Sequence, residues 1–166
     1  MSKLKGVAGK PFSQGLQASE LESFLEKDGR LQQAIELAET RMDQLRNECP
    51  DLVCLDEKSL ISKLQNGILN FYPPDNVSPY VPLAAKGPWI VTITGSVIFD
   101  TGGYGMLGLG HDPDVVRQAM AEPYVMANVM TPSLSQYKFI HALKSRIGSS
   151  RAECPFSSFV CINSGS

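Results

Sequence analysis

The sequence has no long run of lysine or arginine, and its charges nearly cancel. Fifteen basic and seventeen acidic side chains give a formal net charge of −2 over 166 residues. A protein that follows a phosphate backbone needs a concentrated positive surface, so we expect no nucleic acid partner. No stretch approaches the roughly 20 apolar residues of a membrane span, and no apolar segment follows the N-terminal lysines as in a signal peptide. We therefore expect a soluble, cytoplasmic protein with no membrane partner.

Cysteine and histidine are also scarce. The two histidines, His111 and His141, lie far in sequence from every cysteine pair, and the cysteine spacings match no zinc signature. The four cysteines are Cys49, Cys54, Cys154 and Cys161. We expect no metal site, and reduced thiols fit the cytoplasm. Cys161, in the apolar run SSFVCI, is expected to be a small buried hydrophobic residue.

The first third of the sequence predicts helices. Ser19 and Glu22 have the spacing of a capping box, and Asp28 with Gly29 should end that helix. A second helix is expected over residues 30–48, where apolar residues recur every three or four positions and must be buried against another element. This stripe is Leu31, Ile35, Ala38, Met42 and Leu45. Asp56 can cap a third helix. Its apolar side would be Leu60, Ile61, Leu64 and Ile68.

The remainder alternates strands and helices. The four prolines of FYPPDNVSPYVP indicate a linker or extended arm. Strands are expected over 89–94 and 97–101, joined by Gly95 and Ser96 in a two-residue type II′ turn. Helices should follow from Pro113, capped by Asp112, and over 132–147, capped by Thr131 with Gly148 past its end. A buried strand is expected over 157–162, so the pattern favours an α/β protein.

The glycine-rich stretch TGGYGMLGLGHDP, residues 101–113, contains a literal GxGxxG at Gly103, Gly105 and Gly108. A dinucleotide fingerprint needs a helix that opens on the second or third glycine, and Gly108, Gly110 and Pro113 forbid one there. We therefore do not expect a dinucleotide site. Glycine permits positive φ and the close approach of a ligand, so this loop, with Tyr104, could form the floor of a pocket.

The sequence CINSGS, residues 161–166, places Asn-Ser-Gly-Ser directly after the apolar strand. Successive backbone N–H groups and hydroxyls in such a turn can hold a phosphate. An ordinary polar loop is the alternative reading from these residues alone.

In their order, these segments resemble the class III pyridoxal-phosphate-dependent aminotransferases, which are of fold type I. The stretch GPWIVTITGSVIFDTGGYGMLGLGHDPDVVRQAM is similar to the family's N-terminal hairpin, glycine loop, Gly-His pair and following helix, and CINSGS resembles its phosphate loop. The resemblance covers residues 79–166. It implies a helical extension (1–75), a small-domain segment (76–126) and the first helix and strand of an incomplete cofactor-binding large domain (127–166).

The resemblance also implies site residues. Ser164, Gly165 and Ser166 would hold the phosphate of pyridoxal 5′-phosphate, and Tyr104, Gly103 and Gly105 would line the substrate pocket. The family's Schiff-base lysine lies downstream of the phosphate loop. We therefore expect a truncated chain, inactive alone, with no catalytic residue of its own. Lys138 and Lys144 precede the phosphate loop and are expected to lie on a solvated helix face.

Two functions follow as expectations. The first is a transaminase, a homodimer by resemblance, that transfers an amino group between an amine or amino acid and a 2-oxo acid. The second is a non-catalytic binding or assembly module that never meets the cofactor. A lysine following the phosphate loop in the native polypeptide would decide for the first.

Overall fold

In the computed structural model, which describes residues 13–69, 73, 76, 78–101, 108–125, 130–147 and 153–160, six helices accompany a three-stranded antiparallel sheet. The expected mixed α/β class is confirmed at this level. The chain divides into two compact units, one up to Ala121 and one from Glu122 onward. The elements of the first unit are α1 (Ala18–Leu25), α2 (Gly29–Glu48), α3 (Pro50–Val53), α4 (Glu57–Gln65), β1 (Pro82–Lys86), β2 (Trp89–Thr92), β3 (Val97–Phe99) and α5 (Asp114–Ala121). The second unit contains α6 (Leu134–Ile147).

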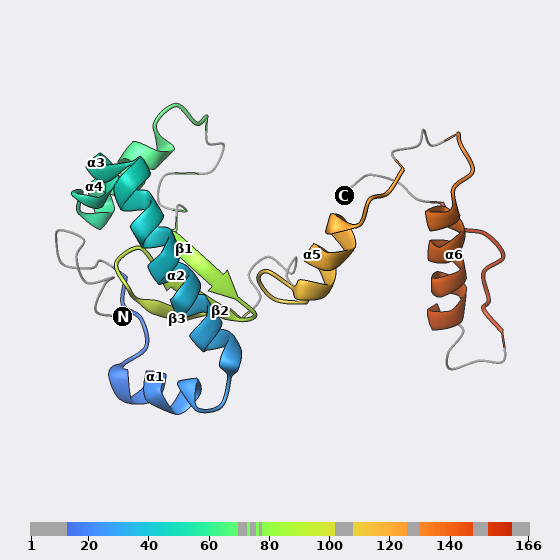
Figure 1. The fold of residues 1–166 in the computed structure, drawn as a ribbon, viewed down its shortest axis with the longest axis horizontal. Helices are drawn as coiled ribbons and strands as arrows, with labels where there is room; N and C mark the ends of the chain where they lie inside the picture. Colours follow the sequence, from blue (N-terminus) through green and yellow to red (C-terminus); the bar gives the residue numbers. More distant parts are fainter. Residues whose placement is uncertain are drawn as a thin grey trace. The chain divides into compact units, whose positions relative to one another are not determined.

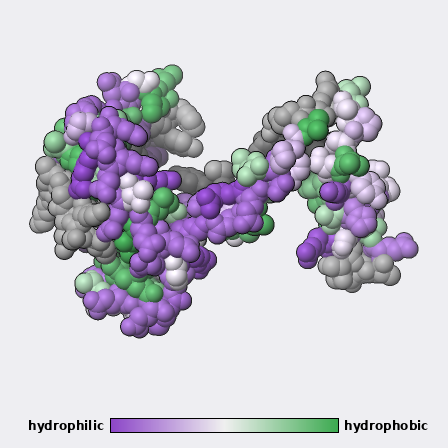
Figure 2. Space-filling view, viewed as in Figure 1, coloured by the Kyte–Doolittle hydropathy of each residue, from purple (hydrophilic) through white to green (hydrophobic). Residues whose placement is uncertain are grey.

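Helix α2 supplies one side of the core of the first unit. It lies against β1 and β2 (Figure 1), so the predicted apolar stripe is buried against the sheet. Leu31, Ala38 and Met42 are fully buried, Ile35 is nearly so, and Leu45 packs at the edge of the cluster. On the face shown in Figure 2, green hydrophobic residues of this unit form only separate patches among hydrophilic ones. The prediction of this helix was right in its buried face and its C-terminal end, but the helix begins at Gly29, one residue before the predicted start.

The sheet is a meander in the order β1-β2-β3, in which β2 is buried along its whole length. Strand β1 falls in a segment where the sequence predicted none. The β2–β3 hairpin was predicted, but its turn was not. Thr92 N–H donates to the Ser96 carbonyl at 2.9 Å and Gly95 N–H to the Thr92 carbonyl at 3.0 Å, with Gly95 at φ +80°. The loop thus has three residues with glycine in the left-handed position, not a two-residue type II′ turn.

Several predicted helix caps were misplaced. Helix α1 has Gln17 as its N-cap, and the Glu20 carboxylate accepts from the Gln17 N–H at 3.0 Å, two positions before the predicted Ser19 and Glu22 pair. The Asp56 cap of α4 was right, since its carboxylate accepts from the Ser59 N–H at 3.0 Å. Of the apolar side predicted for α4, Leu60 alone is fully buried, whereas Leu64 and Ile68 are exposed.

The caps of the two later helices also differ from the prediction. Helix α5 begins at Asp114, and the Pro113 carbonyl accepts its first helical bonds. Asp112 does not cap it, because this residue has a φ of +47° and its carboxylate pairs with cations. At α6, Ser133 Oγ accepts from the Gln136 N–H at 3.2 Å, so Ser133 takes the place predicted for Thr131.

The chain before α1 is fixed to the sheet and to α4. Ser13 donates from both its N–H and its Oγ to the buried Glu57 carboxylate, at 3.1 Å each. Leu16 N–H donates to the Val97 carbonyl at 2.9 Å, which adds a bond along β3. A Cβ at Gly15 would lie 2.6 Å from the Val97 nitrogen, so only glycine fits there. These contacts cover the outer edge of β3.

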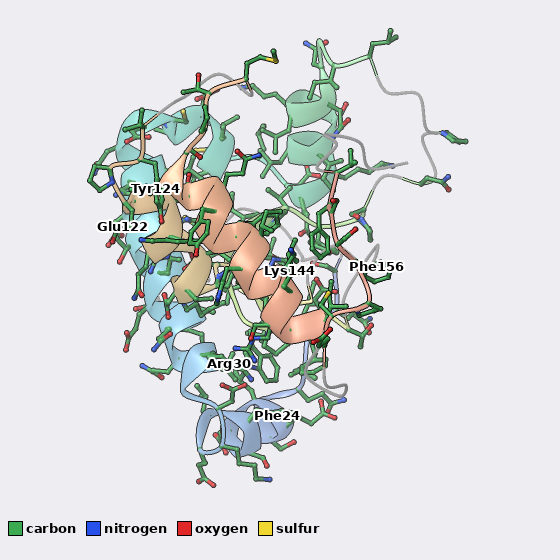
Figure 3. All side chains as sticks on the ribbon, turned by 90° about the vertical axis from the view of Figure 1, so that its right-hand side faces the viewer. Phe24, Arg30, Glu122, Tyr124, Lys144 and Phe156 are labelled. Carbon is green, nitrogen blue, oxygen red and sulfur yellow. The ribbon has the colours of Figure 1, made fainter. Side chains whose placement is uncertain are left out.

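The described residues of the second unit bury no side chain. Helix α6 exposes Leu134, Tyr137 and Phe139, and Figure 3 shows Lys144 on α6 with Phe156 on the segment after it. The strand predicted over 157–162 is absent from its described part, residues 157–160, where Val160 is 86% exposed. No neighbouring strand is described in this unit, and an isolated strand has no ladder of hydrogen bonds. Gly148 and Cys161 lie outside the described residues. No described helix has the length and apolar character needed to cross a membrane.

The packing of α2 on the sheet yields a stability prediction. Leu31→Ala, at a fully buried position, should lower the free energy of unfolding by about 2–5 kcal/mol, because it removes apolar contacts and leaves a cavity. Leu69→Ala, at a position 98% exposed, is the matched control and should change stability by less than about 0.5 kcal/mol. Urea unfolding followed by circular dichroism measures both. Equal effects of the two substitutions would contradict the described core.

Candidate functional site

A hollow of about 480 Å³ lies in the first unit, where the ends of the glycine-rich loop meet the turn between β1 and β2. Its size falls within the range of small-molecule sites. Four segments contribute to its wall, three of them between residues 87 and 111 and the fourth at Arg30. The lining residues are Arg30, Gly87, Pro88, Phe99, Asp100, Thr101, Gly108, Leu109, Gly110 and His111.

The two ends of the glycine-rich loop are held together beside this hollow. His111 Nε2 lies 2.8 Å from Asp100 Oδ2, and both side chains are largely buried. The backbone of His111 pairs with that of Gly87 through two hydrogen bonds, of 2.9 and 2.7 Å. A Cβ at Gly110 would lie 2.8 Å from the Gly87 Cα, so this glycine allows the two segments to touch. The loop is therefore anchored at both ends.

A chain of polar contacts runs from the core to the opposite wall of the hollow. Trp89, 1% exposed, donates from its indole Nε1–H to Asp28 Oδ2 at 2.9 Å. Asp28 is also the N-cap of α2 and accepts from the Arg30 N–H at 3.0 Å. Its carboxylate binds the Arg30 guanidinium side-on, through Nε at 2.9 Å and Nη2 at 2.8 Å. One carboxylate thus caps the helix, satisfies the buried indole and orients the guanidinium.

These contacts shift both ionisation equilibria toward the charged forms. The pKa of Asp28 lies far below its usual value, chiefly because the Arg30 side chain donates to its carboxylate; burial opposes this shift, and the Trp89 indole adds to it. The same pairing raises the pKa of Arg30. The pair is therefore ionised at all physiological pH values.

The position of the Arg30 side chain depends on Gly87. A Cβ at Gly87 would lie 2.9 Å from Arg30 Cδ and 3.2 Å from Arg30 Cζ, so the Arg30 side chain occupies the space that a side chain at position 87 would need. Gly87 also has a φ of +56°, which a side chain would disfavour. Figure 3 shows Arg30 at the N-terminal end of α2, near Phe24 of α1.

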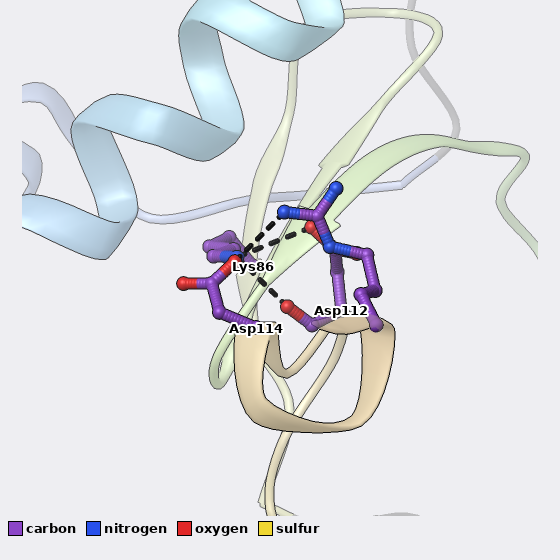
Figure 4. Close-up of polar contacts among 4 residues, drawn as sticks. Lys86, Asp112 and Asp114 are labelled. Carbon is purple, nitrogen blue, oxygen red and sulfur yellow. Dashed lines mark hydrogen bonds and ion pairs between the residues drawn. The ribbon is translucent and has the colours of Figure 1, made fainter. Parts of the chain in front are cut away.

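A second charged cluster joins β1 to α5. Lys86 Nζ donates to Asp114 Oδ1 at 2.6 Å, to Asp112 Oδ2 at 3.2 Å and to the Asp112 carbonyl at 2.8 Å (Figure 4). The lysine side chain is 11% exposed. Asp114, and after it Asp112, raises the pKa of Lys86, and Lys86 in turn lowers the pKa of Asp114. This ammonium therefore stays protonated and attaches the start of α5 to the sheet.

The residues that the sequence predicted for the site lie outside the described part of the chain. Tyr104, Gly103 and Gly105 fall within the glycine loop, and Ser164, Gly165 and Ser166 fall after residue 160. The structure describes instead the anchors of that loop, Asp100 and His111. Sequence reasoning did not assign a role to Arg30 or Trp89, because no local pattern links residues 61 positions apart, as Asp28 and Trp89 are.

The chain matches no protein-family model, and neither curated proteins nor solved structures give a significant match.

The Asp28 contacts predict a pH-dependent contribution to stability. Asp28→Asn should lower the free energy of unfolding by about 1–2 kcal/mol at neutral pH, because the charge-assisted bonds to Arg30 are lost. Since folding lowers the pKa of Asp28, its stabilisation is complete above the unfolded-state value of about 4 and is lost as the pH falls below it. Urea unfolding at neutral and acid pH should show the two proteins converging in acid.

The control for this experiment is Asp43→Asn. Asp43 pairs with Arg46 on the exposed side of α2, and such surface pairs contribute little. We expect a change below about 0.5 kcal/mol at both pH values. A difference between the wild-type protein and Asp28→Asn that stayed constant into acid would contradict the ionic role of Asp28.

Proposed function

We propose that the chain is part of a class III pyridoxal-phosphate-dependent transaminase of fold type I. Such an enzyme transfers an amino group between an amine or amino acid and a 2-oxo acid. The observation that carries the proposal is that residues 87–88, 99–101 and 108–111, which belong to the stretch that resembles the family, form most of the wall of the hollow. A segment with both properties is best explained as part of a substrate pocket.

In this proposal, the loop that contains Tyr104, Gly103 and Gly105 lines the substrate pocket. The described contacts support that role at the ends of the loop, where Asp100 pairs with His111 and His111 pairs with the Gly87 backbone. A pocket wall that is fixed at both ends loses less conformational entropy when a ligand binds. The anchors thus act as positioning residues and do not themselves react.

The cofactor would supply an electron sink for the amino-group transfer, and by resemblance Ser164, Gly165 and Ser166 would hold its phosphate. Its attachment needs a lysine that can lose its proton. Lys86 is the one buried lysine among the described residues, and its two carboxylate partners keep it charged. Lys86 therefore does not fit the cofactor, the other described lysines are exposed, and we assign no reaction step to any of them. By resemblance, the catalytic lysine would follow the phosphate loop.

The proposal includes a homodimer, as the resemblance implies. The exposed apolar side chains of α6 and the absence of a buried side chain among the described residues of the second unit are consistent with a surface that further protein covers. A non-catalytic binding or assembly module is the alternative. The first unit, which buries its own core around Leu31 and Trp89, would be able to fold in either case.

The ion pairs of Lys86 predict its chemical behaviour. When the protein is treated with pyridoxal phosphate and borohydride, Lys86 should stay unmodified, because reaction requires the neutral amine. Lys58, an exposed lysine on α4, serves as the internal control and should be labelled. Peptide mass spectrometry after digestion locates the label. Labelling of Lys86 to the same extent as Lys58 would contradict its described environment.

The proposed function is tested on the native polypeptide that contains this sequence. Isolated from its source, it should have a mass well above 18.1 kDa and carry a visible absorbance band that borohydride abolishes, with the label on a lysine after Ser166. A native polypeptide of 18.1 kDa without such a band would refute the transaminase and favour the assembly module.

A further inference from the structure

We propose that the hollow binds a small monocarboxylate with an apolar body, and that Arg30 receives its carboxylate group. As a statement about substrates, this inference rests on the proposed function, because amino acids and 2-oxo acids carry such a group. As a statement about binding, it concerns only described residues and needs no cofactor. The two can therefore fail separately.

The Arg30 guanidinium is preorganised by its contacts within the protein. Asp28 accepts two hydrogen bonds from it side-on, and the buried Trp89 indole donates to Asp28. The Arg30 side chain also packs against Gly87. A free arginine side chain would lose considerable rotamer entropy on binding an anion. Here folding has already fixed much of that freedom, which favours binding.

The guanidinium keeps donors for a ligand. Arginine has five N–H donors. Asp28 uses one on Nε and one on Nη2, which leaves both donors of Nη1 and the second donor of Nη2. No further hydrogen bond from the Arg30 side chain is found within the described part of the chain. The Nη1 and Nη2 edge presents two parallel donors, which is the geometry that a carboxylate accepts.

The other walls of the hollow indicate the rest of the ligand. Pro88, Phe99 and Leu109 supply apolar surface, and the side chains of Phe99 and Leu109 are 47% and 66% exposed. Thr101 adds a hydroxyl. A pocket with apolar walls and one oriented guanidinium suits an amphiphilic ligand, with an aliphatic or aromatic body on Phe99 and its carboxylate on Arg30.

The charges around the hollow favour a ligand with one negative charge over a ligand with two. Asp28 already offsets Arg30, and Asp100 adds a second carboxylate beside His111. Among the described residues that line the hollow, Arg30 is the one side chain with a fixed positive charge. Both carboxylates repel any anion, and the repulsion grows with the charge of the ligand, so it opposes a phosphate dianion more strongly than a monoanion that binds the free edge of Arg30. We therefore infer a monocarboxylate and not a phosphate ester.

The test is a titration of the 166-residue protein with 4-methylpentanoate, followed by ¹H–¹⁵N NMR at neutral pH without cofactor. We expect saturable binding in the millimolar range, since the probe is small, with shifts of the Gly87 and His111 amide resonances. The uncharged analogue 4-methylpentanamide should bind about tenfold more weakly, because it lacks the charge-assisted bond. Inorganic phosphate should not shift these resonances.

Arg30→Gln should weaken binding of 4-methylpentanoate about tenfold. Arg46→Gln, on the same helix, is the matched control and should bind as the wild-type protein does. Arg30→Lys keeps a positive charge beside Asp28 but loses the planar guanidinium, so it should bind 4-methylpentanoate more weakly than the wild-type protein does. This second variant keeps the test decisive if Arg30→Gln folds poorly. Thermal unfolding of each variant establishes that it is folded.

Several results would overturn the inference. These are an absence of saturable binding, equal binding of the acid and its amide, binding of phosphate at the same resonances, or folded Arg30 variants that bind as the wild-type protein does. If the probe binds as expected but the native protein lacks the cofactor, the site stands and the transaminase fails. If the native protein is a transaminase and the probe does not bind, the proposed function stands and the carboxylate site at Arg30 is refuted.

Discussion

The hydrogen bond from the Trp89 indole to the Asp28 carboxylate is the contact on which the rest of the site depends. A buried indole N–H without an acceptor is costly, so the core of the sheet requires an acceptor at this point. Phe24 and Phe99 enclose the same ring, with centroids 5.1 and 5.0 Å from that of Trp89. The requirement fixes the N-terminus of α2 against β2, and with it the position of Arg30.

Backbone contacts connect Arg30 to the two ends of the glycine-rich loop. Arg30 lies over Gly87, Gly87 touches Gly110, and the backbone of His111 pairs with that of Gly87. Each close approach requires a residue without a side chain, so the glycines here serve packing as much as flexibility. The Asp100 and His111 pair then closes the loop at its base. The helical N-terminal segment therefore belongs to the site, because it supplies Arg30 to the wall of the hollow.

The sequence predicted those features that depend on nearby residues. The α2 stripe follows from helical periodicity, and the Asp56 cap and the β2–β3 pairing follow from local signals. The sequence failed to predict features that depend on contacts between distant residues. Strand β1 forms by pairing with β2, and Asp112 binds Lys86 instead of capping α5. The contacts of Arg30 with Asp28 and Gly87 likewise have no periodic signature. The proposed phosphate loop depends on resemblance alone and stays a prediction.

The exchange rate of the Trp89 indole N–H with solvent is the sharpest test of its hydrogen bond to Asp28. The sequence has a single tryptophan, so its one indole resonance in the ¹H–¹⁵N spectrum needs no assignment by mutation. A buried indole bonded to a carboxylate should exchange only through opening of the first unit, and hence far more slowly than in a free peptide. We expect slow exchange. Exchange at the rate of a solvent-exposed indole would contradict it, and the described position of Arg30 would then lose its basis.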